Sequence, residues 1–136
     1  MPLQNLEQIR AKHALSFAND VAAGKVTATG KQGGDAMKKI PAMIMASGLL
    51  AAIAFSIEEN KSGSSRPGHQ AIFDAIARHL ASEEIGITPG VSTAGELINH
   101  LAGSDSQTLK LATSETLEWL GYARRFLTGG DNEDEA

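Results

Sequence analysis

The sequence predicts an all-α protein: a compact single-domain bundle of five to seven helices around a buried central helix pair. Residues 40–57 carry no charge and are bracketed by lysines and glutamates. Elsewhere apolar residues recur at spacings of three and four, and no segment alternates apolar and polar residues as a strand would. The 136 residues include no cysteine, so neither disulfides nor cysteine-bound zinc can supply the core.

The uncharged segment is expected to form the central pair. It is short and alanine-rich for a membrane span, and a helix that is apolar on all sides belongs inside a protein. Pro41 can stand in a first helical turn or restart a helix. Gly48 is expected to end the first helix in a left-handed conformation, which gives helices over 36–46 and 49–60.

Residues 3–23 are expected to form the first helix. Arg10 falls within its apolar stripe and must therefore snorkel to solvent or find a carboxylate, because an unpaired buried charge is very costly. A structural role is favoured there over RNA contact. The glycines of 24–34 predict a loop, which has no GxxxxGK[ST] order and is not a phosphate-binding P-loop.

The second half of the chain begins with a flexible connection, 60–68, followed by a helix over 69–82. Thr93 and Glu96 form a T-x-x-E capping box that opens a short helix.

A last helix is expected over 105–127, with Ser104 and Gln107 repeating the capping device and the glycines at 129–130 ending it. Residues 1–128 then form the single domain, and 129–136 an acidic disordered tail. The apolar face of this helix consists of Leu109, Ala112, Thr116, Trp119, Leu120, Ala123, Phe126 and Leu127.

Catalytic patterns are missing from the sequence. The four histidines show no HExxH or comparable metal-ligand spacing, and adjacent glutamates diverge on a helix instead of converging across a cleft. We therefore expect no enzyme activity, no metal and no cofactor. A phosphotransfer bundle using His13 or His79 is an alternative, because such modules carry one exposed histidine on a helical bundle.

The net charge of −4 comes from the last six residues, and the rest of the chain is neutral. The last six residues hold four of the sixteen acids, which leaves twelve acids against twelve Lys and Arg. Arg124 and Arg125 suit the C-terminal end of a helix, where the dipole favours cations. Lys38 and Lys39 gain nothing from a nearby N-terminus, so they are candidates for RNA phosphate or a neighbouring subunit's acids. Plain solubilising charge is the alternative.

Three blocks resemble one family: RAKHALSF, KKIPAMIMASGLLAAIAF and LEWLGYARRF, at 10–17, 38–55 and 117–126. The family is the small helical subunit, subunit five, of the type III-B CRISPR effector (Cmr) complex. The resemblance implies a non-catalytic, all-helical subunit that stacks in several copies beside the backbone subunits carrying the guide RNA. These copies line the groove in which the target RNA pairs with the guide.

The resemblance also implies partners and a location. The partners would be other Cmr subunits, further copies of the chain, and guide and target RNA through the complex. The charged N-terminal segment has no signal-peptide core, so a cytoplasmic protein without membrane contact is expected. A free-standing helical adaptor is the main alternative. The candidates for RNA or subunit contact are those in the matching blocks: Arg10, Lys38, Lys39, Arg124 and Arg125.

Overall fold

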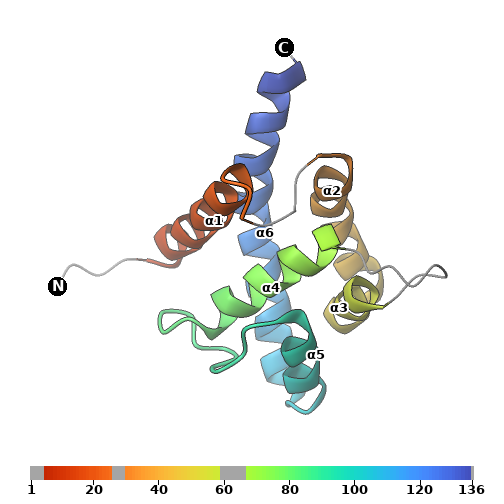
Figure 1. Ribbon diagram of the computed structural model, residues 1–136. Coiled ribbons are helices and arrows are strands. Elements are labelled where there is room, and N and C mark those ends of the chain that lie inside the picture. Colours follow the sequence, from red (N-terminus) through yellow and green to blue (C-terminus); the bar gives the residue numbers. More distant parts are fainter. Residues whose placement is uncertain (1–4, 26–29, 59–66, 136) are drawn as a thin grey trace.

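The computed structural model describes residues 5–25, 30–58 and 67–135, and within these ranges the chain forms six α-helices and no strand. The predicted all-α class is confirmed. The helices, shown in Figure 1, are α1 (Leu6–Ala22), α2 (Gly30–Ser47), α3 (Leu49–Ile57), α4 (Pro67–Ala81), α5 (Ala94–Ala102) and α6 (Ser106–Glu135).

Helix α6 is the longest element, and α1 and α2 both pack against it. Helix α4 crosses α6 in Figure 1 and contacts every other helix of the described chain. The core lies at this crossing, where Phe73, Ile76 and Leu80 of α4 and Trp119 and Leu120 of α6 are almost completely buried. Burial of such large apolar side chains is the main contribution to stability.

The break between α2 and α3 is where the sequence placed it. Gly48 has φ of +96°, a conformation that side chains with a Cβ rarely adopt, and its N–H donates to the Ile44 carbonyl at 2.8 Å. Pro41, however, lies well inside α2 and neither opens nor restarts a helix. Its ring removes one backbone donor without ending the helix.

The α2–α3 pair is buried on one face only, so the expectation that it is enclosed on all sides is wrong. Met37, Ile40 and Ile44 of α2 face the core. Met45 on the opposite face is 79% exposed. The pair lies at the side of the bundle in Figure 1, while α4 and α6 occupy its centre.

Two predicted loops are shorter than expected. Helix α2 begins at Gly30, inside the segment 24–34, of which 26–29 lie outside the described residues. Glycine keeps its backbone N–H, so it lowers helix propensity without preventing helical hydrogen bonds. Of the predicted connection 60–68, residues 60–66 lie outside the described chain, and Pro67 is already the first residue of α4. Proline suits that position because its fixed φ matches a helix and no donor is needed there.

Side chains cap the N-termini of α5 and α6, and the cap of α6 lies one residue later than predicted. Thr93 caps α5 as predicted, accepting from the Glu96 N–H at 3.2 Å. The Glu96 carboxylate, however, accepts from the Ser92 N–H at 2.9 Å and not from the Thr93 N–H, so the second half of the predicted capping box is wrong. Helix α6 is capped by Asp105, whose carboxylate accepts from the Thr108 N–H at 2.8 Å, and the predicted cap at Ser104 is wrong. An aspartate carboxylate is a stronger acceptor than a hydroxyl and takes the position one residue later.

The predicted end of the last helix at Gly129 and Gly130 is also wrong, because α6 continues to Glu135 and projects beyond the other helices (Figure 1). Separation of the acidic tail from the folded domain stays a prediction. Among the described helices, none combines the length and apolar character that a membrane crossing requires.

Candidate functional site

The arginine within the apolar stripe of α1 does find a carboxylate. Arg10 donates two hydrogen bonds to Glu115 of α6, from Nε to Oε2 at 2.8 Å and from Nη2 to Oε1 at 2.7 Å. Its Nη1 lies 3.9 Å from the exposed carboxylate of Glu118. The hydrogen bond to Glu115 raises the pKa of Arg10. Such a two-bond pair fixes the geometry as well as adding energy. It joins α1 to α6.

Two histidines extend this pair into α4. His79 Nε2 lies 2.9 Å from Glu115 Oε2, and His79 Nδ1 lies 2.7 Å from His13 Nδ1. Because a carboxylate only accepts, we place the His79 proton on Nε2, which leaves Nδ1 to accept from the Nδ1–H of His13. Burial lowers the pKa of both histidines, so both are neutral in the folded protein near neutral pH.

Glu115 is the centre of this chain of contacts. Burial by itself would raise its pKa, but the hydrogen bonds from Arg10 and His79 outweigh burial, and the net direction is downward. The carboxylate is therefore ionised beside a cation and a neutral histidine pair. We call Arg10, Glu115, His79 and His13 the internal network; it ties α1, α4 and α6 together.

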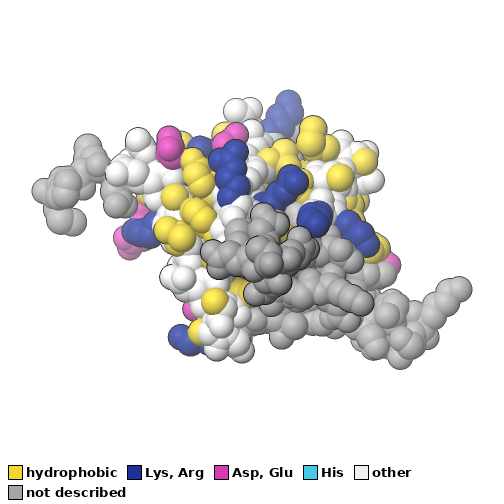
Figure 2. Space-filling view, turned by 90° about the horizontal axis from the view of Figure 1, so that it is seen from above, with side chains coloured by type: hydrophobic (Ala, Val, Ile, Leu, Met, Phe, Trp, Pro, Cys, Tyr) yellow, Lys and Arg dark blue, Asp and Glu magenta, His cyan; other side chains and the backbone are white. Residues whose placement is uncertain are grey.

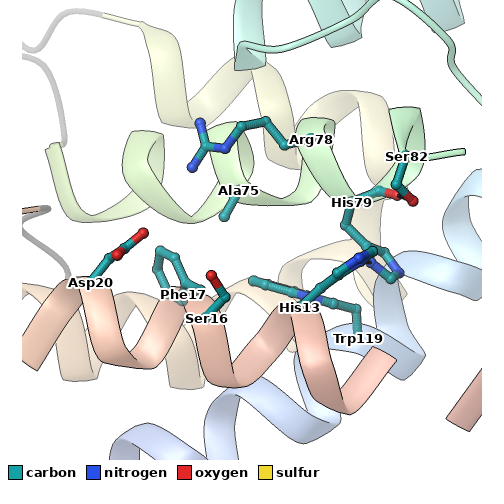
Figure 3. A pocket seen from close by; sticks show the side chains of 9 residues that line it. All are labelled: His13, Ser16, Phe17, Asp20, Ala75, Arg78, His79, Ser82 and Trp119. Atoms are coloured by element: carbon teal, nitrogen blue, oxygen red, sulfur yellow. Dashed lines mark hydrogen bonds between the residues drawn. The ribbon is translucent and has the colours of Figure 1, made fainter. Parts of the chain in front are cut away.

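A cavity of about 240 Å³ adjoins the histidine pair between α1 and α4 (Figure 3). His13 and His79 lie at one end of it, over the Trp119 ring, and Asp20 and Arg78 lie toward the other. No group of three or more metal-ligating side chains occurs within the described chain. His79 is 2% exposed, so it does not meet the condition of an exposed phosphoacceptor histidine, and His13 is only half-buried.

The other predicted contact residues point outward. Lys38, Lys39, Arg124 and Arg125 are all exposed. Figure 2 looks onto the end of the molecule where α6 projects; Lys and Arg side chains gather across the middle of this face, and Asp and Glu lie mainly at its margin. Arg10 does not belong with them, because its guanidinium is turned toward Glu115.

The bounds of α2 and α6 show whether the helix dipole can explain these cations. Lys38 and Lys39 lie near the middle of α2, and Arg124 and Arg125 lie well before the end of α6. The helix dipole acts only within the first and last turns. It therefore does not account for Arg124 and Arg125, contrary to the explanation offered from the sequence.

Sequence reasoning missed Glu115 and the contact between His13 and His79. A signal for Glu115 was present: it precedes Thr116 and lies four residues before Trp119, at the edge of the apolar face of α6. An acid at the edge of one apolar stripe is a natural partner for an arginine within another. No such signal exists for the histidines, which are 66 residues apart.

Fold and site together define a small all-α protein in which Arg10 is paired internally with Glu115, while four exposed cations lie outside the terminal turns of their helices: Lys38, Lys39, Arg124 and Arg125. The family model of the CRISPR-associated protein (Cas_Cmr5) matches residues 6–129. The chain therefore belongs to this family of CRISPR-associated Cmr subunits, as the three sequence blocks indicated. No curated protein matches the sequence.

Proposed function

We propose that the chain is a non-catalytic small subunit of the type III-B RNA-guided effector complex, acting in the cytoplasm in antiviral defence. Several copies stack along the backbone of the complex and line the groove that receives the target RNA. Membership of the Cas_Cmr5 family supports the assignment to the complex. The exposed cations support a position next to the anionic RNA.

The observation that carries the RNA contact is the position of four cations on the surface: Lys38, Lys39, Arg124 and Arg125 are exposed and lie outside the terminal turns of their helices. Among the side chains that the structure describes, no carboxylate forms an ion pair with Lys38 or Lys39. The charges of Lys38 and Lys39 are therefore available to an anionic partner. Because the body is neutral, binding by one copy is expected to be weak and sensitive to salt. Several copies along one RNA multiply that affinity.

The first test is recovery of the complex. A tagged chain expressed in its host should bring down guide RNA together with larger CRISPR-associated subunits. Recovery of an unrelated protein without RNA would instead support the free-standing adaptor.

The second test reverses surface charge within the assembled complex. Arg124→Glu combined with Arg125→Glu should weaken target-RNA binding about tenfold or more and reduce the salt dependence by about one for each lost phosphate contact. Lys12→Glu combined with Lys110→Glu changes the net charge equally and is the matched control. Equal RNA affinity for the two double variants, with unchanged helix content, would contradict the proposal.

A further inference from the structure

The cavity of about 240 Å³ between α1 and α4 is lined by more than the histidine pair. Its wall also includes Ser16, Phe17 and Asp20 of α1, Ala75 and Arg78 of α4, and Trp119 of α6 (Figure 3). Ser16 and Ala75 have small side chains, which leave the space between the two helices open. Drug-sized ligands occupy pockets of ~300–1,000 Å³, so this smaller cavity suits a single heterocycle. We call it the α1–α4 cavity.

Two opposite charges at one end of the cavity are not paired with another side chain. Asp20 extends from α1, and Arg78 comes from the facing helix α4 (Figure 3). Within the described chain, neither the Asp20 carboxylate nor the Arg78 guanidinium takes part in a hydrogen bond or an ion pair, whereas Arg10 and Lys12 both have carboxylate partners. Asp20 offers two acceptor oxygens, and Arg78 offers a planar set of donors. A ligand with donors on one edge and acceptors on the next satisfies both groups.

The inner wall of the cavity is aromatic. Phe17 and Trp119 are 4% and 1% exposed, and their ring centroids lie 5.6 Å apart. Unpaired nucleic-acid bases are recognised by aromatic side chains at their faces and by hydrogen bonds at their edges. The α1–α4 cavity combines these two elements, so its chemistry fits a base.

The order of acceptor and donor in the cavity favours one base. Guanine carries two neighbouring donors, N1–H and the N2 amino group, which together match the two oxygens of a carboxylate such as that of Asp20. Its O6 and N7 are acceptors, and an arginine such as Arg78 binds them through two hydrogen bonds. Adenine and cytosine present a ring-nitrogen acceptor where guanine presents N1–H, and this acceptor would face the carboxylate. Uracil has one N–H on this edge instead of two donors.

We infer that the α1–α4 cavity binds an unpaired guanine base. Asp20 accepts from N1–H and the N2 amino group, Arg78 donates to O6 and N7, and Phe17 and Trp119 contact the ring system. The base comes from single-stranded RNA or from a free guanine nucleotide, since both present the same edges. The inference goes beyond the proposed function, which assigns phosphate contacts to exposed cations and assigns no contact to a base.

Nuclear magnetic resonance of the isolated full-length chain tests the site directly. Trp119 is the single tryptophan of the chain and lines the cavity, so one indole N–H resonance reports on binding. Titration with guanosine monophosphate should shift this resonance saturably, and adenosine monophosphate should bind about tenfold more weakly or worse. Inosine monophosphate, which lacks only the N2 amino group, should bind severalfold more weakly than guanosine monophosphate.

Charge-removing variants have matched controls on the same protein. Asp20→Asn and Arg78→Gln should each weaken binding of guanosine monophosphate about tenfold, because each breaks a two-bond contact with the base. Glu7→Gln and Lys110→Gln remove the same charges at exposed positions that do not line the cavity, and they should leave the affinity unchanged.

A filling variant tests the cavity without changing charge. Ala75→Leu should occupy the space and abolish the shift, whereas Ala51→Leu, on an exposed position of α3, should not. Circular dichroism of each variant establishes that helix content is retained.

An RNA titration identifies the source of the base. If a hexamer of adenosines with one guanosine binds more tightly than guanosine monophosphate, while the all-adenosine hexamer does not, the base comes from RNA. If only the mononucleotide binds, the source is a free nucleotide; both results support the site. Three results would overturn the inference: no saturable shift with either guanine ligand, equal affinity for guanosine and adenosine monophosphates, and equal affinities of Asp20→Asn and Glu7→Gln. Failure of the proposed function is seen separately, as loss of co-purifying guide RNA and Cmr subunits.

Discussion

Replacement of Glu115 by alanine should lower the free energy of unfolding by about 3 kcal/mol. The change leaves the Arg10 guanidinium and the Nε2–H of His79 without their acceptor, and loss of one partner from a buried ion pair costs ~3–5 kcal/mol. We expect the lower end of that range, because the Arg10 side chain is 18% exposed and Glu118 lies 3.9 Å away. For a chain of this size the loss corresponds to a decrease of about 10 °C in Tm.

Conservative variants distinguish the contribution of the ion pair to the free energy of unfolding from the contribution of packing. Glu115→Gln should cost about half as much as Glu115→Ala, because the amide can still accept from Arg10 and the His79 tautomer can invert to accept from the amide N–H. Glu118→Gln should change the free energy of unfolding by less than ~0.5 kcal/mol, as for other exposed pairs. Replacing both Arg10 and Glu115 by methionine should cost less than Glu115→Ala alone, because no charge is then left unpaired.

Urea denaturation followed by far-ultraviolet circular dichroism measures all four variants on one scale. A loss below about 1 kcal/mol for Glu115→Ala would refute the reasoning, since the network would then contribute no more than a surface pair. Equal losses for Glu115→Ala and Glu118→Gln would refute it as well.

Further predictions concern the core, the backbone and pH. Trp119→Ala should lower the free energy of unfolding by ~3–5 kcal/mol, because this side chain is 1% exposed and a cavity would remain. Gly48→Ala should cost about 1–2 kcal/mol through its positive φ, whereas Gly121→Ala, in open space on α6, should stabilise by ~0.5–1 kcal/mol; both follow from thermal denaturation. Burial lowers the pKa of His13 and His79, so the unfolded chain binds protons at a higher pH than the folded chain does. Their contribution to stability is therefore complete above the ordinary histidine pKa of ~6.5 and is lost as the pH falls below it. Urea denaturation at about pH 7.5 and 5.5 should show this loss, and replacing both histidines by glutamine should reduce it.

The helices themselves could be predicted from the sequence because apolar residues at spacings of three and four demand a buried face. Their ends could be predicted only in part, because glycine ends one helix and lies inside another. Gly48 has a φ of +96° and separates two helices, whereas α6 continues through Gly129 and Gly130. A glycine lowers helix stability by only about 1 kcal/mol, so packing and the neighbouring hydrogen bonds decide whether it ends a helix.

The internal network was predictable only in part. Arg10 in an apolar stripe required a carboxylate, and that requirement follows from the cost of burying a charge. Which carboxylate meets it depends on how α1 packs against α6, since Arg10 and Glu115 are 105 residues apart. The contact between His13 and His79 depends on the same packing together with that of α4.

The fold contains cations of two kinds, one paired inside the protein and others exposed on its surface. Mutations of the two kinds should therefore affect different properties. Arg10 is held by Glu115, so its removal should act on stability before it acts on any partner. Lys38 and Lys39 lie on exposed positions in the middle of α2, beyond the reach of the helix dipole, so we expect their charge to contribute little to the stability of the fold. Reversing both to glutamate should change the free energy of unfolding by less than ~0.5 kcal/mol while it weakens target-RNA engagement by the assembled complex. A stability loss as large as that of Glu115→Ala would mean that these lysines belong to the fold and not to a partner surface.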